Sequence, residues 1–173
     1  MALDSHSEIK ITNRNGEVIC SAKIDTTDIE KVIGKYLVFM SNGYVCIRDG
    51  KKITGLHRYL TSALDGEEVD HINGDRSDNR KSNLRRCTRS QNFMNKCKQS
   101  NNKSGFRGVY WNSHIKNPKW VAYITVERKR KHLGYFDNIE DAIEARVKAE
   151  EIYHGEYKTN NERWEVTYWD KCM

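Results

Sequence analysis

The sequence predicts an α+β chain that is divided into small modules instead of being built around one large core. Alternating segments joined by Asn-Gly turns fill the first fifty residues, whereas helical periodicity appears only in later segments. Of the 173 residues, 37% are hydrophobic and 31% are charged, which leaves little apolar surface for a single large core. We therefore predict an N-terminal β-rich segment, a strand–loop–strand–helix (ββα) unit, and a C-terminal three-stranded antiparallel sheet with one helix.

Residues 1–53 form the predicted β-rich segment, which is also a candidate for contact with a partner. Two turns that end in Asn-Gly, at residues 13–16 and 41–43, each separate a pair of alternating runs, and such turns are strong hairpin signals. The expected strands are Glu8–Thr12, Val18–Ile24, Tyr36–Met40 and Tyr44–Arg48, with a short helical turn at Thr27–Ile33 between the two pairs.

Residues 54–97 form the predicted ββα unit. Thr54 is a candidate N-cap for a helix through about Leu64, because apolar residues between them recur on one helical face. Extended segments follow at Glu68–Ile72 and Leu84–Cys87, separated by a long polar loop. The run Thr88-Arg89-Ser90-Gln91 matches a capping box, which predicts a helix from Arg89 to about Lys96.

Residues 98–104 lack any apolar anchor and are predicted to be a linker. The next module, residues 105–157, is expected to contain three strands and an amphipathic helix whose apolar side chains cover one sheet face. The tail, residues 158–173, carries three aromatic residues that suffice to dock it onto the body. The expected elements are Arg107–Trp111, Trp120–Arg128, Lys131–Phe136 and the helix Asn138–Tyr153, the apolar helix positions are Ile139, Ala142, Ile143, Ala145, Ala149 and Ile152, and the tail aromatics are Trp164, Tyr168 and Trp169.

Positive charge is concentrated in one part of the chain. Residues 76–110 hold ten Lys or Arg and one acidic residue, Asp78, whereas the whole chain has a net charge of +6. Such a stretch is typical of a protein that binds the nucleic-acid backbone, although a run of Lys and Arg can also be a solvated surface.

The cysteines and the hydropathy pattern exclude several classes of protein. The five cysteines are an odd number without any Cys-x-x-Cys pair, which argues against a disulfide framework or a zinc knuckle. The N-terminus has no apolar signal region, and no segment is long and apolar enough to span a bilayer. We therefore expect free thiols, a cytoplasmic location, and no membrane partner.

Four polar residues in the ββα unit have the chemistry that phosphodiester hydrolysis requires: Asp70, His71, Asn83 and Asn92. A histidine titrates near neutral pH and can act as the base that deprotonates water. A carboxylate and an amide, here Asp70 and Asn92, suit Mg²⁺ or Mn²⁺ better than zinc. Asn83 is suited to hold the His71 ring in one orientation. Taken singly, Asn83 is more often a turn residue and Asn92 a solvated helix residue. Their concentration in one basic unit favours a catalytic role.

The run LHRYL…EVDHINGDRSDNRKSNLRRCTRSQN, over roughly residues 56–95, resembles the HNH homing endonucleases of phages and mobile introns. The resemblance implies a ββα-metal active site in which His71 is the general base and Asp70 with Asn92 holds one divalent metal ion. Asn83 is then the orienting residue that supplies the middle letter of the motif. Asn92 stands where the family name expects a histidine, which the resemblance implies is a ligand swap.

Several basic residues near this unit are candidate contacts to the DNA backbone. His57 either bonds within the fold or contacts a phosphate and protonates the leaving group, and Arg58 is a candidate phosphate contact. The other candidates in the basic stretch are Arg85, Arg86 and Arg89.

Residues 104–157 resemble the APETALA/ethylene-response-factor DNA-binding domain, through the motifs RGV, KWVAYI and LGYF and a helix that starts D-x-x-E-D-A. That resemblance implies a three-stranded sheet laid in the major groove of DNA. Alternation along the central strand places Ala122, Ile124 and Val126 toward the helix and Tyr123, Thr125 and Glu127 outward. Trp111 and Trp120 are either core residues or part of this surface. The expected groove contacts are Arg107, Tyr110, Tyr123, Thr125, Arg130 and His132.

Together these patterns predict a site-specific, homing-type endonuclease that acts on double-stranded DNA. It would hold one Mg²⁺ or Mn²⁺ ion per active site and no small-molecule cofactor. We expect the protein to be a monomer in preference to a dimer and to act in a bacterial cell that hosts a phage or mobile element. Two alternatives are a DNA-binding regulator with an inactive nuclease unit and a non-specific DNA nuclease. A non-specific nuclease needs only phosphate contacts, so the expected groove-binding module argues against it.

Overall fold

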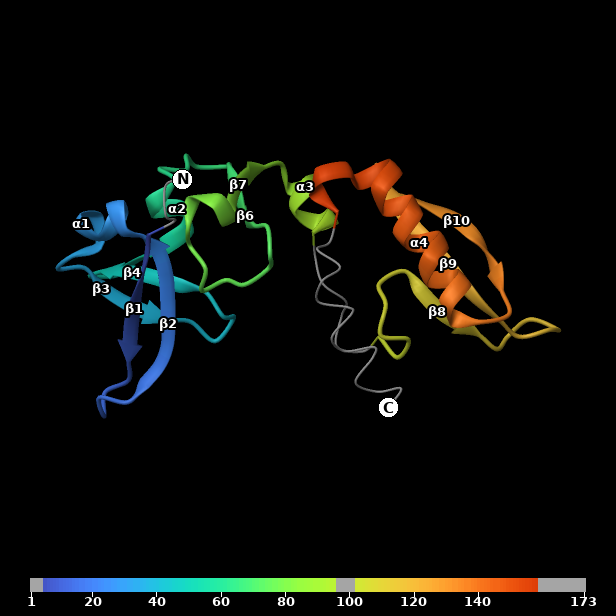
Figure 1. The fold of residues 1–173 in the computed structure, drawn as a ribbon, viewed down its shortest axis with the longest axis horizontal. Helices are drawn as coiled ribbons and strands as arrows, with labels where there is room; N and C mark the ends of the chain where they lie inside the picture. The colour runs from blue at the N-terminus through green and yellow to red at the C-terminus, as the bar shows by residue number, and fades with distance from the viewer. Residues whose placement is uncertain (1–4, 96–101, 159–173) are drawn as a thin grey trace. The chain divides into compact units, whose positions relative to one another are not determined.

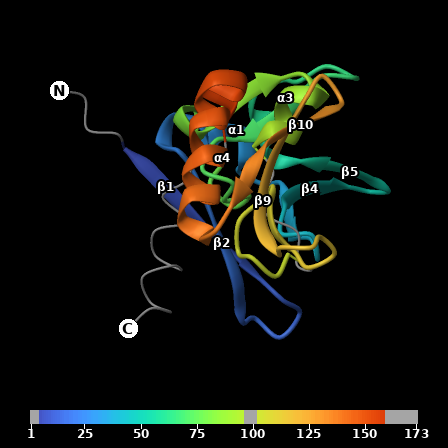
Figure 2. The same ribbon diagram turned by 90° about the vertical axis from the view of Figure 1, so that its right-hand side faces the viewer.

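The computed structural model describes residues 5–95 and 102–158. The chain has a mixed α/β fold with several small antiparallel sheets, and it divides into two compact units, residues 1–89 and 90–173. Figure 1 labels strands β1 to β4, β6 and β7 in the first unit and β8 to β10 with α4 in the second, and Figure 2 labels β5. The division after Arg89 lies inside the predicted 54–97 module, and the finer domain boundaries stay a prediction.

The first unit begins with two antiparallel sheets, and each of the two predicted turns joins two strands of one sheet. The first turn is closed by the Asn13 side chain, whose Oδ1 accepts hydrogen bonds from the amides of Asn15 and Glu17. The first sheet is the hairpin of β1 (His6–Thr12) and β2 (Val18–Asp25), and the second contains β3 (Tyr36–Phe39), β4 (Val45–Asp49) and β5 (Lys52–Gly55) in that order. Between the sheets, η1 (Thr26–Asp28) and α1 (Ile29–Val32) form the predicted helical turn.

The helix predicted from Thr54 to Leu64 is shorter, and its predicted N-cap is wrong. Thr54 is the strand partner of Ile47 in β5, so α2 (Leu56–Leu60) begins after Gly55. Ser62 has a φ of 50°, which ends the helical conformation, and Leu64 is 69% exposed. The physical reason is pairing with β4, which the helical periodicity of the segment does not reveal.

One hydrophobic core joins β1, β2, α1, β4 and α2. The predicted boundary at residues 53 and 54 therefore lies within a continuous core, in which α2 packs against the N-terminal strands. The buried members of this core are Ile11, Ala22, Ile24, Val32, Val45, Ile47, Leu56 and Leu60.

We expect Leu56→Ala to lower the free energy of unfolding of the first unit by about 2–5 kcal/mol, because it leaves a cavity in this core. Leu64→Ala is the matched control, and its effect should be within about 0.5 kcal/mol because the side chain is mainly in solvent. Denaturant unfolding measures both values. Equal effects of the two substitutions would contradict this description of α2.

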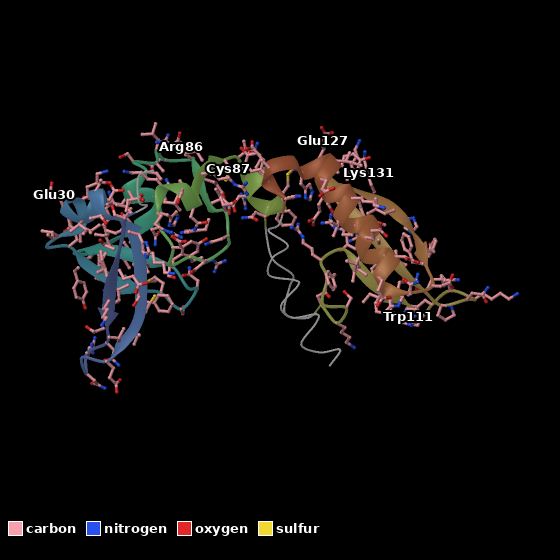
Figure 3. All side chains as sticks on the ribbon, in the orientation of Figure 1. Glu30, Arg86, Cys87, Trp111, Glu127 and Lys131 are labelled. Carbon is pink, nitrogen blue, oxygen red and sulfur yellow. The ribbon has the colours of Figure 1, made fainter. Side chains whose placement is uncertain are left out.

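The last elements of the first unit are β6 (Glu68–His71) and β7 (Leu84–Cys87), which form an antiparallel hairpin, with η2 (Lys81–Asn83) just before β7. Both strands lie where the sequence predicts them, and Figure 3 labels Arg86 and Cys87, the last two residues of β7. The helix α3 (Arg89–Met94) follows, with Arg89 in the first unit and the rest in the second. The specific ββα-metal arrangement stays a prediction.

The second unit is a three-stranded antiparallel sheet in the order β10-β9-β8, with β8 (Val109–Asn112), β9 (Lys119–Val126) and β10 (Lys129–Phe136). The helix α4 (Ile139–His154) lies along one face of this sheet in Figure 2, followed by η3 (Gly155–Tyr157). Asn138 caps α4, because its Oδ1 accepts a hydrogen bond from the Asp141 amide at 2.8 Å. The core on this face includes Val109, Ala122 and Ala142.

Two details of the second unit differ from the predictions. The central strand ends at Val126, because Glu127 and Arg128 form a turn with φ values of 50° and 64°, so Glu127 is not on the outer face of a strand. Ile152 is 74% exposed instead of covering the sheet. The helix face that points inward is partly polar. It carries Ala142 and, at four-residue spacing after it, the buried residues Arg146, Glu150 and His154.

This buried polar stripe is held by specific bonds. The Nε of Arg146 donates to the carbonyl of Arg107 at 3.1 Å, and its guanidinium forms a 2.8 Å ion pair with Glu150. Burial lowers the pKa of Arg146 and raises that of Glu150 from their usual values. The stripe therefore ties α4 to the turn before β8.

The predicted linker, residues 98–104, lies outside the described residues except for its end. Asn102 and Ser104 are fastened into the second unit, since their side chains donate to the carbonyls of Phe106 and Val109 respectively. The predicted tail beyond Lys158, with Trp164, Tyr168 and Trp169, also lies outside the described residues. The described cysteines, Cys20, Cys46 and Cys87, are free thiols. None of the helices in residues 5–95 and 102–158 is long and apolar enough to cross a bilayer.

Candidate active site

The β6–β7 hairpin places Asp70 and His71 together at the end of β6. Asp70 pairs with Arg85 across the hairpin, and His71 pairs with Leu84. Both acid and imidazole are buried, at 8% and 3% exposed, although they are polar. A buried polar pair at the end of a short strand is costly without partners, which marks the position as a functional candidate.

The loop between these strands is fastened by Asn83. Its Oδ1 accepts a hydrogen bond from the Asn73 amide at 2.9 Å, and its Nδ2 donates to the Asp78 carbonyl at 2.7 Å. The backbone carbonyl of Asn83 also accepts from the Ile72 amide. Asn83 therefore closes both ends of the loop beside His71, and its orienting role toward the ring itself stays a prediction.

His71 lies in a small aromatic cluster with His57 and Tyr44. The His57 and His71 ring centroids are 5.0 Å apart in an edge-on arrangement, and Tyr44 lies 5.1 Å from His57. Burial lowers the pKa of His71 below its usual value, although its hydrogen bond with Asn79 and the Asp70 carboxylate act in the opposite direction. The ring is therefore neutral near pH 7, as a base must be.

His57 is buried more unfavourably than His71. Its Nδ1 has no hydrogen-bond partner among the described residues, and burial lowers its pKa to about 3. Gly55 makes room for it, since a Cβ at that position would lie 2.6 Å from the His57 ring. At neutral pH the ring is a neutral imidazole and not the imidazolium that could protonate a leaving group, and this favours a packing role over acid catalysis.

We expect the first unit to lose stability as the pH falls from about 6.5 toward 3, because unfolded His57 takes up a proton that the folded ring excludes. The contribution of His57 should approach about 1.4 kcal/mol per pH unit inside this window and vanish above it. Unfolding curves between pH 4 and 7 for the wild type and His57→Phe measure it. Equal pH slopes in both proteins would contradict the low pKa.

The Asp70 carboxylate is neutralised within the hairpin by Arg85. The Nε and a terminal nitrogen of Arg85 both donate to Asp70 Oδ2, at 3.1 and 2.8 Å. Other predicted phosphate contacts also have protein partners: Arg58 donates to the carbonyls of Glu67 and Leu64, and Arg86 forms an ion pair with Glu67. Arg89 is exposed. The roles of these residues toward DNA stay predictions.

Asn92, the second predicted metal ligand, is half-buried on α3 in the second unit, whereas Asp70 and His71 belong to the first. No group of three or more His, Cys, Asp or Glu side chains in the described part of the chain is arranged to hold a metal ion. A carboxylate with an amide is a different donor set, and it fits a hard cation that keeps several of its own waters. Asp70 and Asn92 have this donor chemistry, and their role as ligands of Mg²⁺ or Mn²⁺ stays a prediction.

The outer face of the second-unit sheet gathers most of the predicted groove contacts. Strand register pairs Tyr123 with His132 and Thr125 with Arg130. The Arg130 guanidinium lies 4.1 Å from the centroid of the Tyr123 ring, and Tyr110 and Tyr123 are in edge contact at 6.0 Å. Tyr135, which the sequence analysis missed, is exposed beside His132 with ring centroids 4.6 Å apart. Aromatic and basic side chains therefore share one surface.

Arg107, Trp111 and Trp120 lie apart from this surface. The Arg107 guanidinium lies over the Phe93 ring and donates to the Met94 carbonyl at 2.9 Å, so α3 is fastened to the turn before β8. Trp120 packs on the core of the helix face, and exposed Trp111 contacts its edge at 5.3 Å. Trp120 thus has the core role that the sequence left open.

One known family matches part of the chain. The family model for the HNH endonuclease domain matches residues 64–94, which include Asp70, His71, Asn83 and Asn92. Searches of curated proteins and of solved structures gave no match. Nucleases of this type use a divalent metal ion and bind DNA. This match identifies residues 64–94 as an HNH endonuclease domain, and the buried Asp70–His71 pair and the Asn83-fastened loop lie within it.

Proposed function

We propose that this protein is a site-specific, homing-type endonuclease that hydrolyses phosphodiester bonds in double-stranded DNA. The observation that carries the proposal is the buried Asp70-His71 pair at the end of β6, within the residues that match the HNH endonuclease domain. An acid and an imidazole side by side supply a metal ligand and a base, which a nuclease needs and a DNA-binding regulator does not.

In the proposed reaction His71 takes a proton from water, and the water oxygen forms a bond to phosphorus as the bond from phosphorus to the leaving 3′ oxygen breaks. Asp70 and Asn92 would hold one Mg²⁺ or Mn²⁺ ion, which supplies stabilisation of the charge on the phosphate and the leaving oxygen. Asn83 keeps the loop after His71 closed. Water returns a proton to the 3′ oxygen.

The second unit is proposed to select the cleavage site, as an APETALA-like domain. Its outer sheet face carries Tyr110, Tyr123, Thr125, Arg130 and His132, and a small sheet of this kind can enter the major groove. Arg85, Arg86 and Arg89 would contact the DNA backbone, for which Arg85 and Arg86 exchange their present partners, Asp70 and Glu67. One catalytic site per chain favours a monomer that nicks one strand.

Incubation of supercoiled plasmid with the protein tests the activity. We expect open-circular product with Mg²⁺ or Mn²⁺ and none with EDTA. DNA binding without cleavage in every metal tested would favour a regulator with an inactive nuclease unit. Rapid conversion of the plasmid to short random fragments would favour a non-specific nuclease.

A further inference from the structure

Asn79 is a buried polar residue that the proposed mechanism does not use. It lies in the loop between β6 and β7, and its side chain has no solvent exposure. Each end of its amide has a partner: Nδ2 donates to the Ser77 carbonyl at 2.9 Å, and Oδ1 lies 3.3 Å from Nε2 of His71. A fully buried amide with both ends engaged has only one stable orientation.

The N-terminal hairpin holds Asn79 in place. The Lys23 amide of β2 donates to the Ser77 carbonyl at 2.9 Å, and the Asn79 amide donates to the Lys23 carbonyl at 2.7 Å. Two residues further along both β2 and the loop, the Lys81 amide donates to the Asp25 carboxylate at 2.8 Å. The edge of β2 therefore supports residues 77–81 as an added short strand would, although the sequence gives no sign of this contact.

These bonds determine which nitrogen of the His71 ring carries the hydrogen. Because Nδ2 of Asn79 is committed to Ser77, the atom that faces His71 is the acceptor Oδ1, and the ring nitrogen opposite it must be a donor. A neutral imidazole has one protonated nitrogen, so Nε2 carries the hydrogen and Nδ1 keeps the lone pair.

We propose that Asn79, supported by β2, is a positioning residue that fixes His71 as the Nε2–H tautomer and leaves Nδ1 as the atom that accepts the proton from water. The proposal rests on the proposed function, in which His71 is the base. It assigns the N-terminal hairpin a part in the active site, since the hairpin holds the residue that orients the base.

The first test compares Asn79→Ala with the wild type in cleavage assays. We expect kcat to fall about 10- to 100-fold, the usual effect of losing a residue that orients a functional side chain, while KM for DNA is unchanged. In a His71→Ala background the same substitution should cause no further loss, because the two residues act as one unit. An unchanged kcat for Asn79→Ala, or additive losses, would overturn the proposal.

Two further variants separate orientation from simple support of the loop. Asn79→Asp keeps an oxygen acceptor for His71 but loses the donation to Ser77, and it should recover part of the activity. Asn73→Ala removes the 3.1 Å bond from Asn73 to Asp78 in the same loop but leaves the Asn79–His71 pair in place, and it should lose less activity than Asn79→Ala. Equal losses in Asn79→Ala, Asn79→Asp and Asn73→Ala would reduce Asn79 to a structural role and overturn the proposal.

Nitrogen-15 NMR of the histidine rings tests the tautomer without DNA, metal or cleavage. His71→Ala identifies the His71 signals among those of the six histidines. At neutral pH we expect a protonated Nε2 and an unprotonated Nδ1 for His71 in the wild type, and a mixture of tautomers in Asn79→Ala. A protonated Nδ1 in the wild type would overturn the proposal. A wild type that fails to cut DNA but shows the Nε2–H tautomer would instead contradict the proposed function alone.

Discussion

Replacement of His71 by alanine is expected to lower the rate of DNA cleavage by about 10²- to 10⁴-fold, the contribution of a general base. The neighbouring His57 is a poor substitute base, because burial lowers its pKa to about 3 and its ring therefore accepts a proton far less readily. Binding of uncleaved DNA should change little, since His71 is only 3% exposed and makes its contacts within the protein. Single-turnover cleavage and a binding titration on the same DNA measure the two effects.

His6→Ala is the matched control, because His6 lies exposed on β1 of the same unit and should cut at the wild-type rate. The unfolding temperature of His71→Ala must be measured as well, since the ring packs against His57. A folded His71→Ala protein with wild-type activity would refute the assignment of His71 as the base.

Gly108→Ala is expected to unfold or loosen the second unit. Gly108 has a φ of +78°, and a Cβ there would lie 2.4 Å from the Tyr123 carbonyl and 2.5 Å from Nε of buried Arg146. Backbone strain and overpacking each cost about 1–3 kcal/mol, and neither backbone nor the Arg146–Glu150 ion pair can move freely. The variant should lose site preference more than it loses plasmid nicking, because Asn92 is the one proposed active-site residue in the second unit.

The control for this prediction is Gly155→Ala. Gly155 also has a positive φ, +51°, but a Cβ there meets nothing within 4 Å. It therefore carries the backbone strain without the clash, and thermal unfolding should separate the two variants. If Gly108→Ala unfolds the second unit and leaves the cleavage site unchanged, the proposed role of that unit in site selection is wrong.

The sequence predicted the local features of the fold correctly. Asn-Gly turns located the first two hairpins, and alternation located β6, β7 and the three strands of the second unit. Asp70 and His71 could be placed at the end of β6 because a short strand and a polar loop are both visible in the residue pattern. These features depend on neighbours in the chain.

Features that depend on distant residues could not be predicted. The helix α2 begins late because Thr54 pairs with β4, and Asn79 is buried because Lys23 of β2 binds it. The polar residues of α4 are buried because Arg146 reaches the carbonyl of Arg107. A charged residue on a helix is ordinarily solvated, so only the partner supplied by the tertiary fold reveals these positions.

The most direct test of the central claim is the mapping of cleaved ends on phage and bacterial host genomic DNA after digestion with Mg²⁺ or Mn²⁺. The proposed site-specific HNH endonuclease predicts that the ends gather at one or a few sites and disappear in His71→Ala. Ends scattered along the DNA, or no ends in any metal although the DNA is bound, would contradict it.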